Sequence, residues 1–550
     1  MKLFGSSRLS KFFLKTKKSK SQKVVDSSGR SSLGLTEFSE TISEDSPIET
    51  SSDAWSLAFA LDQEGRLVDF SSRSTRRLSD VSSRSRRGSR PSIAKVARTQ
   101  KAKKAVKATA QELYGPYPES LPVPFISEDE STPPKEILDR CESYLDLKGI
   151  CDYRDKGTPD EWVPRDGRLI RLTGRHPLNV EPPIALLRKF RFITPPNLHY
   201  VRSHGICPQL TWEDHTLIVG GEVFMPIEIR MDDLISLGEP REIPVTLTCA
   251  GNRRKEQNTI RQTIGFNWGP CATSTSVWKG ILVRDVLKAV GVSEKDTEGL
   301  HVEFLGYEDL PNKIGPGPFE DAPWGETEKF GTSIPLARAM NPAYDIMIAY
   351  EQNGERLHPD HGYPIRLIVP GYTAARNIKW LKQINIIPHE TKNHYFYHDN
   401  RIIPPHVQTM EEAMKGDWFY KPEYVFNELN INSVIASPGH GEKISLVEGL
   451  GKTYTISGYA YTGGGRNVTR VDISLDGGNT WHLAKLDKKE KPTEYGMSWC
   501  WTWWDYDVTV QQFINASEIR CRAWDSSNNR QPEEPIWSLM GYGELTILIH

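Results

Sequence analysis

The chain has 550 residues, more than one ordinary domain of ~100–200 residues accounts for. Hydrophobic residues make up 37% and charged residues 25%, which excludes the disordered class for the chain as a whole, and no apolar run approaches the ~18–20 residues of a membrane span. The net charge of −2 is unevenly spread, because residues 1–110 hold 23 basic and 11 acidic side chains, a net +12 that leaves −14 for the rest.

Seven widely spaced cysteines do not form a disulfide scaffold, and they indicate a reducing compartment with one or two thiols in chemical use. We therefore expect a cytoplasmic protein without a membrane segment. The Lys- and Arg-rich residues 1–25, which contain no acid, also fit a mitochondrial presequence, so a mitochondrial location is the alternative.

Residues 1–115 are predicted to be a disordered basic arm rich in serine and arginine. The arm has no sustained apolar period, so burial would not offset the entropy lost on ordering it. It is also poor in aromatic residues, and we expect no nucleic-acid partner. A solvated tail is the simplest interpretation.

Residues 116–424 are predicted to form a mixed α+β domain. Short apolar runs at residues 242–247 and 365–369 are bounded by Gly and Pro, as buried strands are. Residues 280–290 are typical of a short helix that ends at Gly291.

Residues 425–550 are predicted to form an all-β sandwich of immunoglobulin type. Residues 454–461 alternate between two faces, and residues 471–475 and 481–486 flank a turn at residues 476–479. The turn sequence Asp-Gly-Gly-Asn tolerates positive φ angles.

The segment richest in chemistry is Cys249-Ala250-Gly251-Asn252-Arg253-Arg254-Lys255. It follows a predicted strand directly, and its three cations favour a thiolate over a thiol at Cys249. A thiolate binds soft or high-valent metals. A buried structural cysteine is the competing interpretation, and a Cys–His nucleophile is less favoured because no histidine lies nearby in the sequence.

Two further segments combine cationic and polar residues with Gly and Pro. They are residues 199–205, which hold two histidines and an arginine, and residues 360–380, which hold His361, Arg366, Asn377 and Lys379. Such groups can bind an anion through charge-assisted hydrogen bonds, although exposed loops with ordinary polar contacts are an alternative. Neither phosphate-loop nor dinucleotide fingerprints occur, which disfavours a nucleotide-binding fold.

Taken together, these segments resemble the molybdenum–molybdopterin domain of the sulfite oxidase and eukaryotic nitrate reductase family. The phrases that carry the resemblance lie between about residues 150 and 540, and they are residues 171–179, 265–268, 274–278, 463–466, 475–478 and 535–537. The resemblance implies a sulfite-oxidase-like α+β domain followed by an immunoglobulin-like dimerisation domain, and hence a homodimer.

The resemblance also implies a molybdenum–molybdopterin cofactor, with Cys249 as its one protein thiolate ligand. The implied cofactor-binding residues are Tyr200, Arg202, His204, Glu308, His361, Arg366, Asn377 and Lys379. The implied catalytic pocket consists of Arg202, Arg254, Trp268, Asn400 and Met540. Two arginine forks supply fixed positive charge for an anion, and a tryptophan can keep water away from them.

The substrate that the resemblance favours is nitrate. At the positions where sulfite oxidases carry an Asp-Tyr pair and a third arginine, this chain has Asp399-Asn400 and Met540. A less positive pocket suits monoanionic nitrate better than dianionic sulfite. The expected mechanism is oxygen-atom transfer from nitrate held between Arg202 and Arg254, with Asn400 orienting it.

The chain also departs from the family. We find no His-Pro-Gly-Gly haem loop and no FAD or NAD(P) site, so an external electron donor such as a cytochrome b5-type module is expected. Residues 541–550 differ from the usual end of the β domain, which we expect to be truncated there. A sulfite-oxidising enzyme and an inactive dimerising fragment remain the alternatives.

Overall fold

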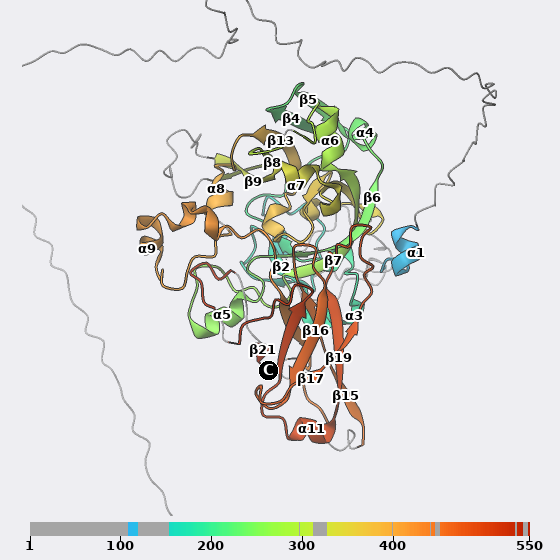
Figure 1. Ribbon diagram of the computed structural model, residues 1–550, viewed down its shortest axis with the longest axis vertical. Coiled ribbons are helices and arrows are strands. Elements are labelled where there is room, and N and C mark those ends of the chain that lie inside the picture. Colours follow the sequence, from blue (N-terminus) through green and yellow to red (C-terminus); the bar gives the residue numbers. More distant parts are fainter. Residues whose placement is uncertain are drawn as a thin grey trace, which may run out of the picture. The chain divides into compact units, whose positions relative to one another are not determined.

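A computed structural model of the chain describes residues 108–118, 153–295, 297–311, 327–398, 400–439, 442–445, 451–533, 536–542 and 548–549. All of them belong to the second of two compact units, Ala102–His550 (Figure 1). The predicted arm up to residue 107 lies outside the described residues. No helix in the described ranges is long and apolar enough to cross a membrane.

The end of the predicted arm is ordered, contrary to expectation. Helix α1 (Ala110–Tyr114) is closed at its start by a capping box between Thr109 and Glu112. Its last residue, Tyr114, packs its ring 5.6 Å from that of Phe192. A capped turn with a partly buried aromatic anchor is stable enough to order a short segment that composition alone assigns to the tail.

In its described residues, the α+β domain contains three sheets. The small sheet has the order β1-β2-β3: β1 (Ile170–Arg171), β2 (Asn179–Glu181) and β3 (Val201–Arg202). The second has the order β11-β10-β7-β6, with β12 also paired to β10: β6 (Arg241–Thr248), β7 (Thr273–Leu282), β10 (Met347–Gln352), β11 (Glu355–Arg356) and β12 (Arg366–Ile368). The third has the order β5-β4-β13-β8-β9: β4 (Thr216–Gly221), β5 (Ile227–Arg230), β8 (His301–Pro311), β9 (Thr327–Pro335) and β13 (Leu381–Ile387).

Short helices connect and cover these sheets (Figure 1). The α-helices are α3 (Ile184–Phe190), α4 (Met231–Ile235), α5 (Arg254–Ile260), α6 (Val283–Ala289), α7 (Leu336–Met340), α8 (His394–Tyr397) and α9 (Met410–Lys415). The 3₁₀ turns are Tyr153–Asp155, Pro196–Leu198, Pro342–Tyr344, Pro359–His361, Ala374–Arg376, Trp418–Tyr420 and Pro422–Tyr424.

The helix predicted over residues 280–290 is shorter than expected. It begins at Val283, because residues 280–282 complete strand β7. Gly280 pairs with strands on both sides, and a Cβ atom there would lie 2.2 Å from the carbonyl oxygen of Ile348. Because the backbones approach so closely, only glycine fits at position 280, and this residue belongs to the sheet. The predicted end is confirmed, since Gly291 has a φ of +85°.

The β domain is an antiparallel sandwich of two four-stranded sheets, as predicted. The first has the order β14-β15-β19-β18 and the second β17-β16-β20-β21. The strands are β14 (Asn432–Ser437), β15 (Thr453–Tyr461), β16 (Val468–Ser474), β17 (His482–Leu483), β18 (Lys485–Asp487), β19 (Thr502–Thr509), β20 (Arg520–Asp525) and β21 (Leu548–Ile549), with helix α11 (Val510–Ile514) after β19. Buried side chains from both sheets form one core.

The single strand predicted at residues 481–486 is instead two strands. β17 pairs with β16 and β18 pairs with β19, so the chain passes from one sheet to the other here. The turn before it is as predicted: Gly477 and Gly478 have φ angles of +70° and +95°.

Candidate functional site

One cavity of about 190 Å³ brings the predicted site residues together. Its lining comes from the end of β3, the residues just after β6, Glu308 within β8, the start of β12 at Arg366, and the segments around Asn400 and Met540. All thirteen predicted residues line it: Tyr200, Arg202, His204, Cys249, Arg254, Trp268, Glu308, His361, Arg366, Asn377, Lys379, Asn400 and Met540. Their sequence positions span more than 300 residues, so only the fold makes them neighbours.

Cys249 follows the last residue of β6, and its backbone N–H donates to the carbonyl oxygen of Ala272 at 2.9 Å. This bond continues the pairing of β6 with β7 and holds the thiol at the rigid end of a strand. The other four cysteines in the described ranges are buried, whereas Cys249 is partly exposed and lines the cavity. Among the cysteines of the described ranges, it is therefore the one that borders the cavity.

The Arg254 side chain lies in a narrow space beside Gly251 and Gly265, where a larger residue at either position would collide with it. A Cβ atom on Gly251 would lie 2.5 Å from Nη2, and one on Gly265 would lie 2.4 Å from Cζ. The guanidinium donates from Nε to the carbonyl oxygen of Met540 and from Nη1 to that of Phe266, both at 3.0 Å. Its Nη2 makes no hydrogen bond to any described residue, so this edge is available to an anion in the cavity.

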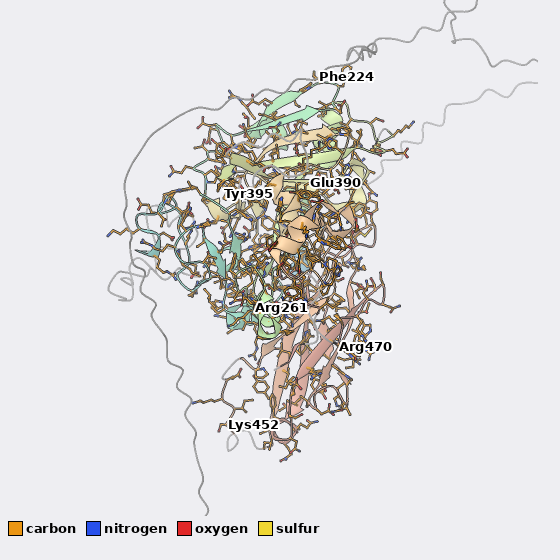
Figure 2. All side chains as sticks on the ribbon, turned by 90° about the vertical axis from the view of Figure 1, so that its left-hand side faces the viewer. Phe224, Arg261, Glu390, Tyr395, Lys452 and Arg470 are labelled. Atoms are coloured by element: carbon orange, nitrogen blue, oxygen red, sulfur yellow. The ribbon has the colours of Figure 1, made fainter. Side chains whose placement is uncertain are left out.

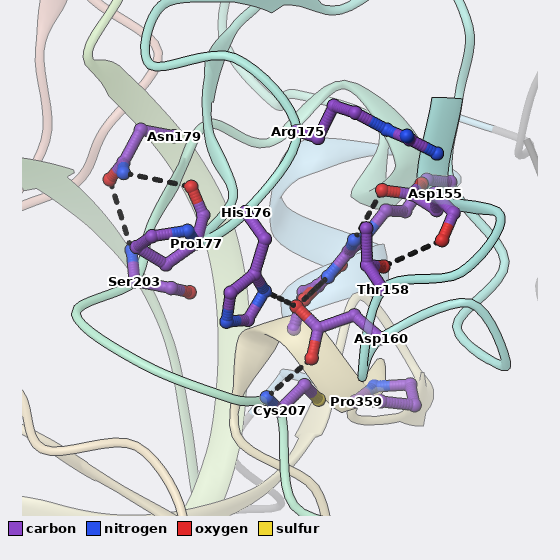
Figure 3. Close-up of polar contacts among 12 residues, drawn as sticks. Asp155, Thr158, Asp160, Arg175, His176, Pro177, Asn179, Ser203, Cys207 and Pro359 are labelled. Carbon is purple, nitrogen blue, oxygen red and sulfur yellow. Dashed lines mark hydrogen bonds and ion pairs between the residues drawn. The ribbon is translucent and has the colours of Figure 1, made fainter. Parts of the chain in front are cut away.

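Arg202 provides the second cation of the predicted pocket. Its Nη1 donates to Asn179 Oδ1 at 3.1 Å and to the carbonyl oxygen of Ser203 at 2.6 Å. Asn179 Oδ1 also accepts the backbone N–H of Ser203 (Figure 3). The guanidinium lies 5.3 Å from the ring centre of Phe266. These contacts fix both the direction of the guanidinium and its distance from the Phe266 ring.

Trp268 and Tyr200 form the apolar wall. Both are buried, and their rings meet edge to face at 6.1 Å between centres. Burial raises the pKa of the Tyr200 phenol well above its usual range, which keeps it neutral. Trp268 Nε1 is buried without a hydrogen-bond partner among the described residues. The wall limits water around the arginines, where their charge is then less screened.

A second cationic group lies deeper in the cavity. Arg366 donates from Nη1 to the carbonyl oxygen of His361 at 2.9 Å, while its buried Nε has no partner in the described ranges. Burial lowers its pKa to about 10, so it stays protonated. Lys379 Nζ donates to Ser203 Oγ and to the carbonyl oxygen of Asp360, both at 3.0 Å. Burial lowers the pKa of this amine.

Three histidines pack together in this region, with the tilted rings of His199 and His358 centred 5.1 and 5.2 Å from that of His361. Burial is the largest cause of their lowered pKa values, about 3 for His199 and about 4 for His358. They are therefore neutral at physiological pH. His199 Nε2 is buried without a partner among the described residues.

The remaining predicted residues complete the lining in different ways. His204 packs its ring 4.6 Å from that of Phe330. Burial raises the pKa of the Glu308 carboxyl, whose Oε2 has no described partner. Asn377 uses its side chain within its own loop, accepting the Val369 N–H at 2.7 Å.

Asn400 and Met540 lie on the side of the cavity near the β domain. Asn400 has a left-handed φ of +63°, which asparagine tolerates. Its carbonyl oxygen accepts the N–H of Phe426 at 2.9 Å, while its side-chain amide makes no hydrogen bond within the described ranges. The preceding Asp399 lies outside the described residues.

The sequence suggested that all three cations after Cys249 surround its thiol. The structure shows otherwise. Arg254 lines the cavity, but Lys255 is exposed and Arg253 is buried outside the lining. Arg253 has a left-handed φ of +66°, which turns its side chain away, and it donates from Nη1 to the carbonyl oxygen of Ser433 at 2.8 Å.

Other lining residues were not predicted, among them His199, Phe266, Asp360, Trp380 and Tyr542. His199 and Phe266 are sequence neighbours of predicted ones, which is a usable signal. Tyr542 carries the same signal, because it lies two residues after the predicted Met540.

Comparisons with known proteins agree on the class of domain. The family model described as "Oxidoreductase molybdopterin binding domain" matches residues 204–395, and "Mo-co oxidoreductase dimerisation domain" matches residues 423–545. Nitrate reductase (NADH) of Spinacia oleracea is 49% identical over 407 residues, which cover 74% of this chain and 42% of that protein. Nitrate reductase (NADH) 1 of Arabidopsis thaliana is 48% identical over 408 residues, 74% of this chain and 43% of that protein. The chain thus spans less than half the length of these relatives.

The fold also matches a solved structure. The crystal structure of the sulfane dehydrogenase SoxCD from Paracoccus pantotrophus aligns with a TM-score of 0.51 and 22% sequence identity. The alignment covers 70% of this chain and 87% of that chain. At this identity the likeness concerns the fold alone.

Proposed function

Because the chain belongs to the eukaryotic nitrate reductases of the sulfite oxidase family, we propose that it is a molybdenum-dependent oxidoreductase that reduces nitrate to nitrite. The observation that carries the proposal is the single cavity in which a partly exposed thiol, Cys249, shares the lining with the free Nη2 edge of Arg254. A metal at the thiol and an anion at the guanidinium would lie in one enclosed space.

The residues present fit a molybdenum–molybdopterin group. The cavity combines one thiol with buried hydrogen-bonding atoms that lack partners in the described ranges, on Arg366, His199 and Glu308. Buried polar atoms are normally satisfied, so these indicate a polar, anionic ligand. Cys249 would hold the metal, and the pterin would be bound by Tyr200, Arg202, His204, Glu308, His361, Arg366, Asn377 and Lys379.

When bound, this group supplies oxygen-atom transfer and two-electron redox chemistry. The protein's part is to bind and orient the anion. Arg254 and Arg202 would hold nitrate between them, Asn400 would orient it, and Trp268 would exclude water. One N–O bond of nitrate breaks; two electrons from an external donor and two protons complete nitrite and water. We propose a cytochrome b5-type module as that donor.

Nitrate is favoured over sulfite by the two residues that distinguish the branches. Asn400 and Met540 both line the cavity, and neither adds a positive charge beside Arg202 and Arg254. A pocket with fewer cations discriminates against a dianion. We further propose that two copies of the chain associate through the β domain, which matches a dimerisation domain.

The function can be tested with Cys249→Ser. We expect the wild-type protein to contain molybdenum and to produce nitrite with a reduced viologen dye, and the variant to lose both, because it lacks the thiolate that would hold the metal. Metal analysis and nitrite assays are the measurements. Cys271→Ala, at a buried cysteine outside the cavity lining, is the matched control.

A Cys249→Ser variant that is loaded with molybdenum and active would overturn the assignment. Wild-type protein that turns over sulfite with an electron acceptor, but not nitrate, would replace nitrate by sulfite. Metal-loaded protein that acts on neither anion would support the inactive dimerising fragment.

A further inference from the structure

The β-domain segment of residues 536–542 is fixed against the α+β domain. Trp537 Nε1 donates to the carbonyl oxygen of Arg261 at 3.0 Å, and the Arg261 guanidinium stacks 4.4 Å from the Trp537 ring centre; Arg261 is labelled in Figure 2. The N–H of Ile264 donates to the carbonyl oxygen of Leu539 at 3.0 Å. The segment therefore has a defined position over helix α5 and the loop that follows it.

A tight turn ends this segment at Tyr542. The buried hydroxyl of Ser538 donates to the carbonyl oxygen of Tyr542 at 2.8 Å and accepts its N–H at 3.1 Å. Gly541 has a φ of +65°, and a Cβ atom there would lie 2.7 Å from Arg254 Nε. Only glycine fits this turn without strain, and the turn brings the Tyr542 ring to Arg254.

The ring of Tyr542 covers a face of the Arg254 guanidinium, at 4.9 Å from Cζ to the ring centre. Gly251 lies beside Nη2 and Gly265 beside Cζ, and the carbonyl oxygens of Met540, Gly541 and Phe266 take Nε and Nη1. Nη2 is left without a hydrogen bond to any described residue, and both Arg254 and Tyr542 line the cavity. An aromatic face both attracts a guanidinium and excludes water from it.

We propose that Tyr542 is a positioning residue that holds Arg254 with its Nη2 edge toward the bound anion. The inference rests on the proposed function only for the identity of the anion, nitrate. It concerns a residue at the end of the β domain to which the sequence analysis assigned no role.

The first test measures nitrate kinetics on the molybdenum-loaded enzyme. Tyr542→Ala is expected to raise KM about 2- to 30-fold, the range of a cation–π contact, with a smaller change in kcat. Tyr542→Phe should restore the wild-type KM, because the ring face makes the contact. Tyr495→Ala, at an exposed tyrosine outside the cavity lining, is the control.

The second test measures the modification of Arg254 by phenylglyoxal, followed by peptide mass spectrometry. Tyr542→Ala should increase the rate of labelling at Arg254 severalfold, Tyr542→Phe should not, and nitrate should protect. This measurement needs no turnover. If the wild-type protein reduces no nitrate, the proposed function fails, while the labelling rates still decide the role of Tyr542.

Two results would overturn the role of Tyr542. One is a folded Tyr542→Ala protein, with a wild-type circular dichroism spectrum, whose Arg254 is labelled at the wild-type rate. The other is a Tyr542→Phe protein as impaired as Tyr542→Ala in KM and labelling, which would show that the ring face is not responsible.

Discussion

At the scale of single residues, the cavity depends on glycines, which have no side chain to fill the space around Arg254. Gly265 lies so close to Arg254 that a Cβ atom would be 2.4 Å from Cζ, deep inside van der Waals contact. We expect Gly265→Ala to displace the guanidinium and raise KM for nitrate at least about tenfold, a loss of roughly 1.4 kcal/mol of binding. Steady-state kinetics measure it.

The matched control for this change is Gly220→Ala, in strand β4. A Cβ atom there would lie 3.6 Å from Asn385 Oδ1, an ordinary contact. Equal nitrate kinetics in the two variants would contradict the narrow space around Arg254.

At the scale of elements, the 3₁₀ turn Pro359–His361 and its flanking loop hold neutral histidines. His358 accepts the N–H of Asp360 at 3.2 Å, and burial lowers its pKa from 6.5 to about 4. Its neutral form therefore contributes stability above pH 6.5 that is lost as the pH falls toward 4. His358→Asn should reduce the pH slope of the unfolding free energy in that range by up to about 1.4 kcal/mol per pH unit.

Urea unfolding at several pH values between 4 and 6.5 measures this slope. His482→Asn, at an exposed histidine of β17, provides the comparison. If both variants kept the wild-type slope of the unfolding free energy against pH, the conclusion that His358 is buried in its neutral form would be wrong.

At the scale of the whole molecule, the two domains meet beside the site. Arg253, fully buried and in a left-handed conformation, donates to Asn432 Oδ1 and to the carbonyl oxygen of Ser433 in β14. A strained residue next to Arg254 is thus kept in place by the β domain. Asn432→Ala should lower the unfolding free energy by about 1.5–3 kcal/mol, the range for a hydrogen bond to a charged group.

Chemical denaturation measures this loss, and Asn515→Ala at an exposed helix end is the control. An Asn432→Ala protein as stable as the control would mean that the link between the domains contributes nothing.

The local sequence was sufficient to predict the β6 strand that ends just before Cys249, the turn at Gly477 and Gly478, and the sandwich of the second domain. Each follows from short-range physics: apolar runs, alternation, and backbone angles that glycine permits. The family resemblance then identified thirteen residues that the fold brings to one cavity. The local rules failed at Gly280 and at α1, where the contacts that decide the conformation come from distant strands and rings.

The sequence by itself therefore determined the kinds of elements and the chemical groups that this protein has available. Only the tertiary structure decided that Arg253 faces the β domain while Arg254 faces the cavity, and that Tyr542 covers Arg254. The physical reason is that these assignments depend on contacts between residues up to nearly 300 positions apart. A shift of one residue in position, or a change in the sign of one φ angle, changes which way a side chain points.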